Sequence, residues 1–131
     1  MNRPTDKRDV QFRGLPGDVL ERRVQRADGR SYAHRCSRQI FEAVVGYIDD
    51  HQHEGGFKIQ SIADALDAPM TQVNVALQLL IERGMIESRG RLGYVAPGYA
   101  SAFYVHAMTE FYALVSGNPP TYRAANDKAE G

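Results

Sequence analysis

The sequence has one cysteine, no tryptophan and no long apolar run. A single cysteine, Cys36, cannot close a disulfide within the chain, and a lone cysteine is more often a small buried residue than a reactive thiol. No apolar stretch approaches the roughly 18 to 20 residues that span a bilayer, so we expect no membrane association. The polar first residues lack the apolar core of a secretory signal, which makes the cytoplasm the expected compartment.

Recognisable catalytic patterns are also missing. No nucleophile elbow surrounds a serine, and Gly55-Gly56 lacks the Lys-Ser/Thr pair and the spacing of a phosphate-binding loop. We therefore expect a protein that is not an enzyme and that needs no cofactor. Four side chains of metal-ligand type fall into two pairs at opposite ends of an expected helix, roughly 20 Å apart at 1.5 Å per residue, so no metal site is expected. The pairs are His34 with Cys36 and His51 with His53.

The net charge is zero, but the charges are unevenly distributed. Residues 1–38 hold ten Lys or Arg against five Asp or Glu, and the rest of the chain is acidic by the same margin. Such asymmetry is typical of a basic arm that reaches toward an acidic partner, often nucleic acid, although a solvated tail has the same composition. We predict a basic N-terminal arm over residues 1–34.

The arm is expected to be partly disordered or a hairpin. Residues 1–17 show no sustained periodicity, so no regular structure is predicted there. In residues 19–34, Asp28-Gly29 between alternating polar and apolar residues indicates a hairpin turn, whereas Asp18 with Glu21 would suit the start of a short helix. The hairpin or extended form is the preferred prediction.

Apolar residues recur at helical spacing in four later segments. The expected helices cover residues 37–53, 62–66, 70–83 and 99–115. Ser61 and Asp64 are predicted to cap the second of them. Glycines after the first and third helices predict where those helices end.

Short strands are expected between these helices. One lies at 57–59, and two more, at 85–88 and 92–95, enclose a turn at 89–91. Residues 117–131 have the composition of a disordered tail.

This order of elements is reinforced by a resemblance. The stretch IADALDAPMTQVNVALQLLIERGMI, followed by ESRGRLGYVAP, resembles the helix-turn-helix and wing of bacterial transcriptional regulators of the MarR and GntR groups. The resemblance covers roughly residues 37–98. It implies an α+β fold, mainly helical with a small β-hairpin wing: a winged helix-turn-helix domain over residues 35–98 with an additional C-terminal helix over 99–116.

The resemblance also implies a function. In such domains the second helix of the pair enters the major groove of double-stranded DNA and the wing tip reaches the backbone or the minor groove. Asn and Gln can pair with the adenine edge, which supports the same role from chemistry alone. We predict a sequence-specific DNA-binding transcriptional regulator, acting as a repressor and associated with the nucleoid. The expected DNA contacts are Thr71, Gln72, Asn74 and Gln78, the wing residues Arg89 and Arg91, and Arg22, Arg23, Arg26 and Arg30 of the arm.

The third helix also supports an alternative function. It has no Lys or Arg before Arg83, and its apolar residues Met70, Val75 and Leu79 are expected to be exposed. The alternative is therefore a winged helix that docks a protein partner through this apolar face without binding DNA directly.

The composition of the last expected helix predicts that two copies of the chain associate. It carries more apolar side chains than a domain of this size needs, so a homodimer is expected through Phe103, Ala107, Phe111 and Leu114. Packing of these residues on the first helix of the same chain is the alternative. Four nearby side chains that could line an effector cavity are interpreted as core or interface, and no effector is predicted. They are Tyr99, Tyr104, His106 and Tyr112.

Overall fold

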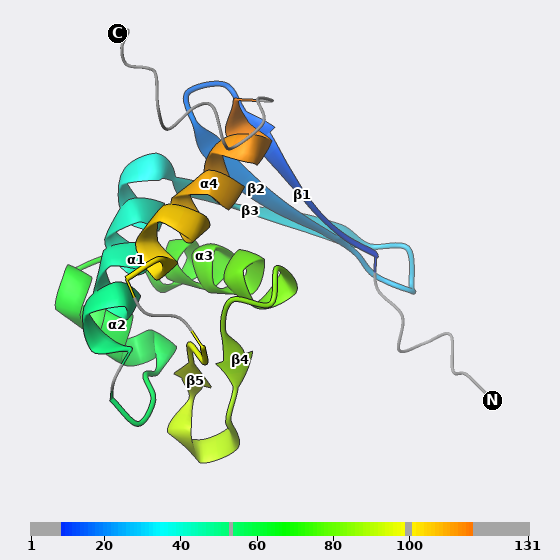
Figure 1. The fold of residues 1–131 in the computed structure, drawn as a ribbon. Helices are drawn as coiled ribbons and strands as arrows, with labels where there is room; N and C mark the ends of the chain where they lie inside the picture. The colour runs from blue at the N-terminus through cyan, green and yellow to red at the C-terminus, as the bar shows by residue number, and fades with distance from the viewer. Residues whose placement is uncertain (1–8, 53, 99–100, 117–131) are drawn as a thin grey trace, which may run out of the picture.

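The computed structural model describes residues 9–52, 54–98 and 101–116 (Figure 1). Three strands come first: β1 (Asp9–Leu15), β2 (Val19–Gln25) and β3 (Ser31–Ser37). The helices of the body are α1 (Arg38–His51), α2 (Ile59–Leu66), α3 (Met70–Glu82) and α4 (Phe103–Val115). Between α3 and α4 lie β4 (Glu87–Ser88), a 3-10 turn η2 (Gly90–Leu92) and β5 (Tyr94–Val95). The expected α+β class is confirmed.

The N-terminal arm is a folded antiparallel sheet in the order β1-β2-β3. The predicted turn at Asp28-Gly29 joins β2 to β3, and Gly29 takes the positive φ of 91° that glycine favours there. The prediction of no regular structure over residues 1–17 is wrong for 9–15, which form β1. The helical alternative for residues 19–34 is also wrong. Residues 1–8 lie outside the described residues.

One face of this sheet belongs to the hydrophobic core. Side chains alternate along a strand, and Leu20, Val24 and Cys36 point to the helices and are fully buried. The sheet and the helices therefore share one core, so the predicted boundary at residue 34 falls inside β3 and separates no independent unit.

Helix α1 forms where its apolar stripe predicted it. The hydroxyl of Ser37 accepts a hydrogen bond from the Ile40 N–H at 3.2 Å, which satisfies one of the free donors at the helix start. Phe41 on this helix stacks on Phe111 of α4 with ring centroids 4.6 Å apart.

Helix α2 begins earlier than predicted. Ile59 is its first residue and Lys58 its N-cap without a side-chain hydrogen bond, so Ser61 and Asp64 lie inside the helix and the predicted capping box is wrong. Of the strand predicted at 57–59, only Phe57 pairs with another strand, where it bridges Tyr94 through two backbone hydrogen bonds of 2.9 and 2.8 Å.

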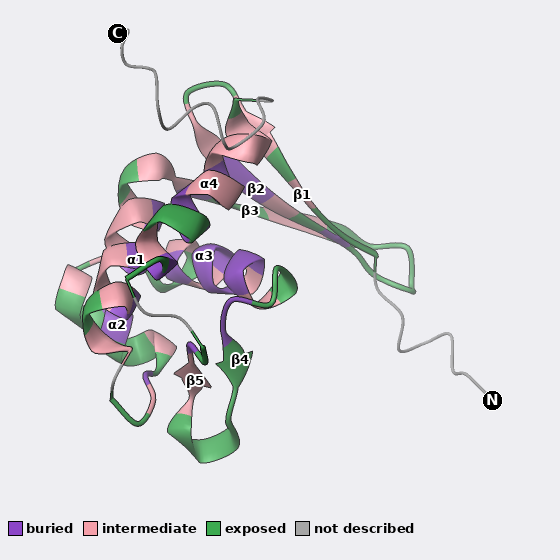
Figure 2. Cartoon of the chain, in the orientation of Figure 1, coloured by how far each residue is buried: buried purple, intermediate pink, exposed green. Residues whose placement is uncertain are grey.

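Helix α3 lies between α1 and the sheet, which buries two of its faces (Figure 2). Val73 and Leu77 form the expected core side. Val75 and Leu79 were expected to be exposed, and that prediction is wrong: both have 0% exposure because β3 packs over them. Met70 at the start of the helix is 42% exposed, as expected.

Helix α4 packs on α1 and on the edge strand β1. The backbones meet so closely at Gly14 that a Cβ there would lie 2.3 Å from the Leu114 carbonyl oxygen. The predicted helix at 99–115 is observed from Phe103, and residues 99–100 and the tail at 117–131 lie outside the described residues. Within the described part of the chain, no helix is long and apolar enough to cross a membrane.

Candidate nucleic-acid interface

The surface of α3 left open by the sheet and α1 is a polar strip. Thr71 is exposed, and Asn74 and Gln78 are partly exposed on the same side of the helix, as their i, i+3 and i+7 spacing requires. The Gln78 amide donates to the Asn74 carbonyl oxygen at 3.3 Å. Three of the four residues predicted to read bases on this helix therefore lie together.

The fourth, Gln72, lies on a different face. Its side-chain oxygen accepts a hydrogen bond from the backbone N–H of Ser37 at 2.9 Å, at the junction of β3 and α1. Gln72 therefore holds α3 to the sheet, and in this conformation its side chain lies there and not with Thr71, Asn74 and Gln78.

The β4–β5 hairpin lies beside the N-terminal end of α2 through the bridge from Tyr94 to Phe57. Gly93 permits this approach, because its φ is +87° and a Cβ would lie 2.3 Å from the Phe57 carbonyl oxygen. Of the two arginines predicted at the tip, Arg91 is exposed, while Arg89 forms an ion pair with Glu87, its Nε lying 2.6 Å from the carboxylate.

The four arginines predicted for the arm divide into different environments. Arg22 and Arg23 are neighbours on β2 and so point to opposite faces of the sheet. Arg22 turns toward the body, and its Nε is buried without a hydrogen-bond partner among the described residues. Arg26 and Arg30 flank Asp28 at the turn that projects beyond the helices (Figure 1), with Arg30 Nη2 3.2 Å from the carboxylate.

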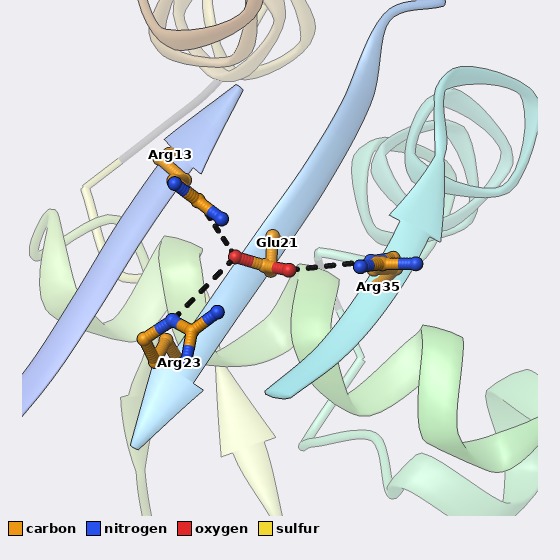
Figure 3. A network of polar contacts seen from close by, with 4 residues as sticks. All are labelled: Arg13, Glu21, Arg23 and Arg35. Atoms are coloured by element: carbon orange, nitrogen blue, oxygen red, sulfur yellow. Dashed lines mark hydrogen bonds and ion pairs between the residues drawn. The ribbon is translucent and has the colours of Figure 1, made fainter. Parts of the chain in front are cut away.

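The outer face of the sheet brings Arg23, one of the predicted DNA contacts, together with Arg13, Glu21 and Arg35, which were not predicted as site residues. Glu21 is fully buried, and three arginines from three strands converge on it (Figure 3). Arg13 Nε lies 2.7 Å from one carboxylate oxygen, Arg35 Nε 3.2 Å from the other, and Arg23 Nε 3.9 Å from the first. The register explains the arrangement, because Arg13 and Arg35 are the cross-strand partners of Glu21. The sequence gives only one indication of this cluster, the alternation of side chains along each strand, and that was not sufficient because the pairing of the strands was not known.

These contacts set the charge of Glu21. The hydrogen bond from Arg13 lowers the pKa of the carboxyl below its usual value of 4.5, burial opposes this, and the bond from Arg35 lowers it further. Glu21 is therefore an anion at neutral pH, and it holds the three guanidinium groups around it.

The residues predicted for dimerisation are mostly internal. Phe103, Ala107 and Phe111 have no exposed surface, because they pack within the core of their own chain, and Leu114 is partly buried against it. Phe103, Ala107 and Phe111 are therefore not available to a second copy in this conformation. The exposed apolar side chain on this helix is Val105, at 60%.

Side chains of metal-ligand type do not form a cluster among the described residues. No three His, Cys, Asp or Glu side chains gather there, and His53 lies outside the described residues. Burial raises the pKa of the Cys36 thiol to about 12. The Tyr104 hydroxyl donates to Glu42 of α1, which makes this tyrosine a link between helices.

The chain matches no protein-family model, no curated protein and no solved structure. The arrangement of the described residues is therefore the basis on which a function can be assigned.

Proposed function

We propose that this protein binds double-stranded DNA in a sequence-specific way and regulates transcription, with α2 and α3 as a helix-turn-helix and the β4–β5 hairpin as a wing. The observation that carries the proposal is the open strip of α3. The sheet and α1 cover every apolar side chain in the middle of this helix and leave Thr71, Asn74 and Gln78 at the surface. Hydroxyl and amide side chains on one helix face are suited to hydrogen bonding with base edges in the major groove.

The connection between the two helices supports this assignment. Helix α2 is followed by its C-cap Asp67, whose φ of 52° and ψ of 48° turn the chain sharply. The Ala68 N–H donates to the Ala63 carbonyl at 3.0 Å. Only residues 67–69 separate α2 from α3. A tight turn of this kind between two helices is a feature of DNA-binding helix-turn-helix motifs.

Positive charge near the α3 strip is limited. Glu82 lies on the exposed side of the helix, and Arg83 pairs with Glu82 and Glu110 at 3.0 and 3.2 Å. Arg91, Arg89 and Lys58 are exposed cations at the hairpin, and Arg89 is paired with Glu87. We therefore expect the α3 strip to select sequence while adding little to salt-dependent affinity.

The surface proposed for the alternative, a protein-docking module, is buried in the structure. It depended on an exposed apolar face containing Val75 and Leu79, and both are inside the core. We therefore do not propose it.

The test is selection of bound duplexes from a random-sequence pool, with the wild type and with Asn74→Ala/Gln78→Ala. The wild type should enrich one motif, and the double variant should lose or change it. Gln60→Ala is the matched control, because Gln60 is an exposed amide on α2 that also makes an i to i+4 side-chain hydrogen bond, at 2.9 Å to Asp64. A two-fold symmetric motif would indicate that two copies bind, whereas equal enrichment by wild type and double variant would refute base reading by α3.

A further inference from the structure

The outer face of the sheet carries a charged cluster that the α3 strip does not use. Because Leu20, Val24 and Cys36 fill the inner face, the side chains of Arg13, Glu21, Arg23 and Arg35 lie on the side away from the core. We call these four residues the arginine cluster. Figure 3 shows Arg13, Arg23 and Arg35 around Glu21 on three neighbouring strands.

The cluster is a cationic surface with an anion beneath it. The side chains of Arg13, Arg23 and Arg35 are 58%, 45% and 65% exposed, whereas that of Glu21 is 0% exposed. Three positive charges therefore surround one covered negative charge. An exposed polyanion would meet guanidinium groups and not the carboxylate.

The contacts with Glu21 use the inner edge of each guanidinium. All three arginines approach the carboxylate through Nε. Beyond these contacts, the side chains of Arg13 and Arg35 remain 58% and 65% exposed and can be reached by an outside acceptor. Glu21 thus restricts the arginine side chains before any ligand arrives, which reduces the entropy lost on binding.

We propose that the arginine cluster binds the phosphate backbone of nucleic acid without regard to base sequence. Arg13 and Arg35 stand on either side of β2 and lean inward onto Glu21, so with Arg23 they form one compact group of exposed cationic donors for the phosphates of a nucleic acid. Guanidinium groups pair with phosphate oxygens through two parallel hydrogen bonds. The choice of nucleic acid as the polyanion rests on the function proposed above, and an acidic protein surface is the competing partner in the test.

The test is fluorescence anisotropy of a random-sequence 20-base-pair duplex over a range of salt concentrations. Arg23→Gln is the main variant, because Arg23 makes the longest contact with Glu21 and its loss disturbs the sheet least. Arg23→Gln and Arg35→Gln should each reduce the slope of log affinity against log salt by about one. Arg83→Gln is the matched control, since it removes one positive charge at the end of α3, and it should leave the slope unchanged.

Glu21→Gln should change the affinity for the duplex in the opposite direction to the arginine variants. It removes the negative charge while keeping an oxygen that can accept from Arg13, so duplex binding should become several-fold tighter at low salt. A purely structural ion-pair cluster predicts unchanged or weaker binding in this variant. Thermal unfolding followed by circular dichroism confirms that each variant is folded.

Unchanged salt slopes in the two arginine variants, together with no gain in Glu21→Gln, would overturn the proposal. Salt-sensitive binding to polyglutamate with none to duplex would also overturn it, in favour of an acidic protein partner. The two proposals can fail separately. If Asn74→Ala/Gln78→Ala leaves sequence selection intact while the arginine variants reduce the slope of log affinity against log salt, base reading by α3 is refuted and phosphate binding by the arginine cluster is supported.

Discussion

The side-chain oxygen of Gln72 lies 2.9 Å from the backbone nitrogen of Ser37 and accepts its N–H. Ser37 is also the N-cap of α1, so one junction joins the end of β3, the start of α1 and the first turn of α3. The sheet that covers α3 is thereby attached to it by a specific polar contact as well as by apolar packing.

Gln72→Ala should lower the free energy of unfolding by about 1 kcal/mol, because the Ser37 N–H loses its acceptor at a partly buried position. Asn74→Ala, on the open strip of the same helix, should change it by less than about 0.5 kcal/mol. Urea unfolding of both variants measures the difference. Equal stability of Gln72→Ala and the wild type would show that this hydrogen bond does not hold the sheet to α3.

Gly14→Ala should lower the free energy of unfolding by about 1 to 3 kcal/mol, because its Cβ would lie 2.3 Å from backbone atoms of α4. Gly46→Ala is the contrasting variant. It lies inside α1 with no atom within 4 Å of the added Cβ, and it should raise stability by up to about 1 kcal/mol. Thermal and urea unfolding test both. A neutral Gly14→Ala would mean that β1 and α4 are not in close contact in solution.

Leu79→Ala should lower the free energy of unfolding by about 2 to 5 kcal/mol, as expected for a fully buried leucine. Met70→Ala, at 42% exposure, should change it by less than about 1 kcal/mol. The comparison tests whether the sheet covers α3. A surface-like effect of Leu79→Ala would restore the apolar docking face and with it the protein-binding alternative.

The thiol of Cys36 should be unreactive in the folded protein. Burial both blocks access and raises its pKa to about 12, so almost no thiolate exists at pH 8. An aromatic disulfide reagent should label the chain only in denaturant. Rapid, complete labelling of the folded protein at pH 8 would show that the sheet opens readily over the core.

The stability of the wild type should fall relative to that of Glu21→Gln as the pH drops below about 4.5. The pKa of Glu21 in the folded protein is lower than its usual value of 4.5 in an unfolded chain, so its carboxylate stabilises the fold above that value and loses this contribution as it protonates. Urea unfolding of the two proteins between pH 7 and pH 3 gives the difference. A constant difference over this range would mean that the arginines do not hold the carboxylate in solution.

Much of the helical body could be predicted from local patterns. The apolar stripe of α1 was confirmed in Phe41, Val44 and Ile48, and α3 begins at Met70 and ends just before Gly84 as expected. These features depend on spacing within one segment and on glycine at the chain turns, so they can be recognised without knowing what each segment contacts.

The candidate surfaces could be predicted only in part. The polar strip with Thr71, Asn74 and Gln78 was identified correctly as a group on one side of α3, while Gln72 was placed with them because nothing local revealed its contact with Ser37. The arm arginines were treated as one set, although strand alternation sends Arg22 and Arg23 to opposite faces.

The sequence by itself determined which four segments of the body are helical, where α2 and α4 end, and that the first third of the chain is basic. Only the tertiary structure decided that Val75 and Leu79 are buried and that Arg13, Arg23 and Arg35 surround Glu21. The physical reason is that helical periodicity arises between residues a few positions apart, whereas the partner of a second helix face and the register of strands depend on segments distant in the chain.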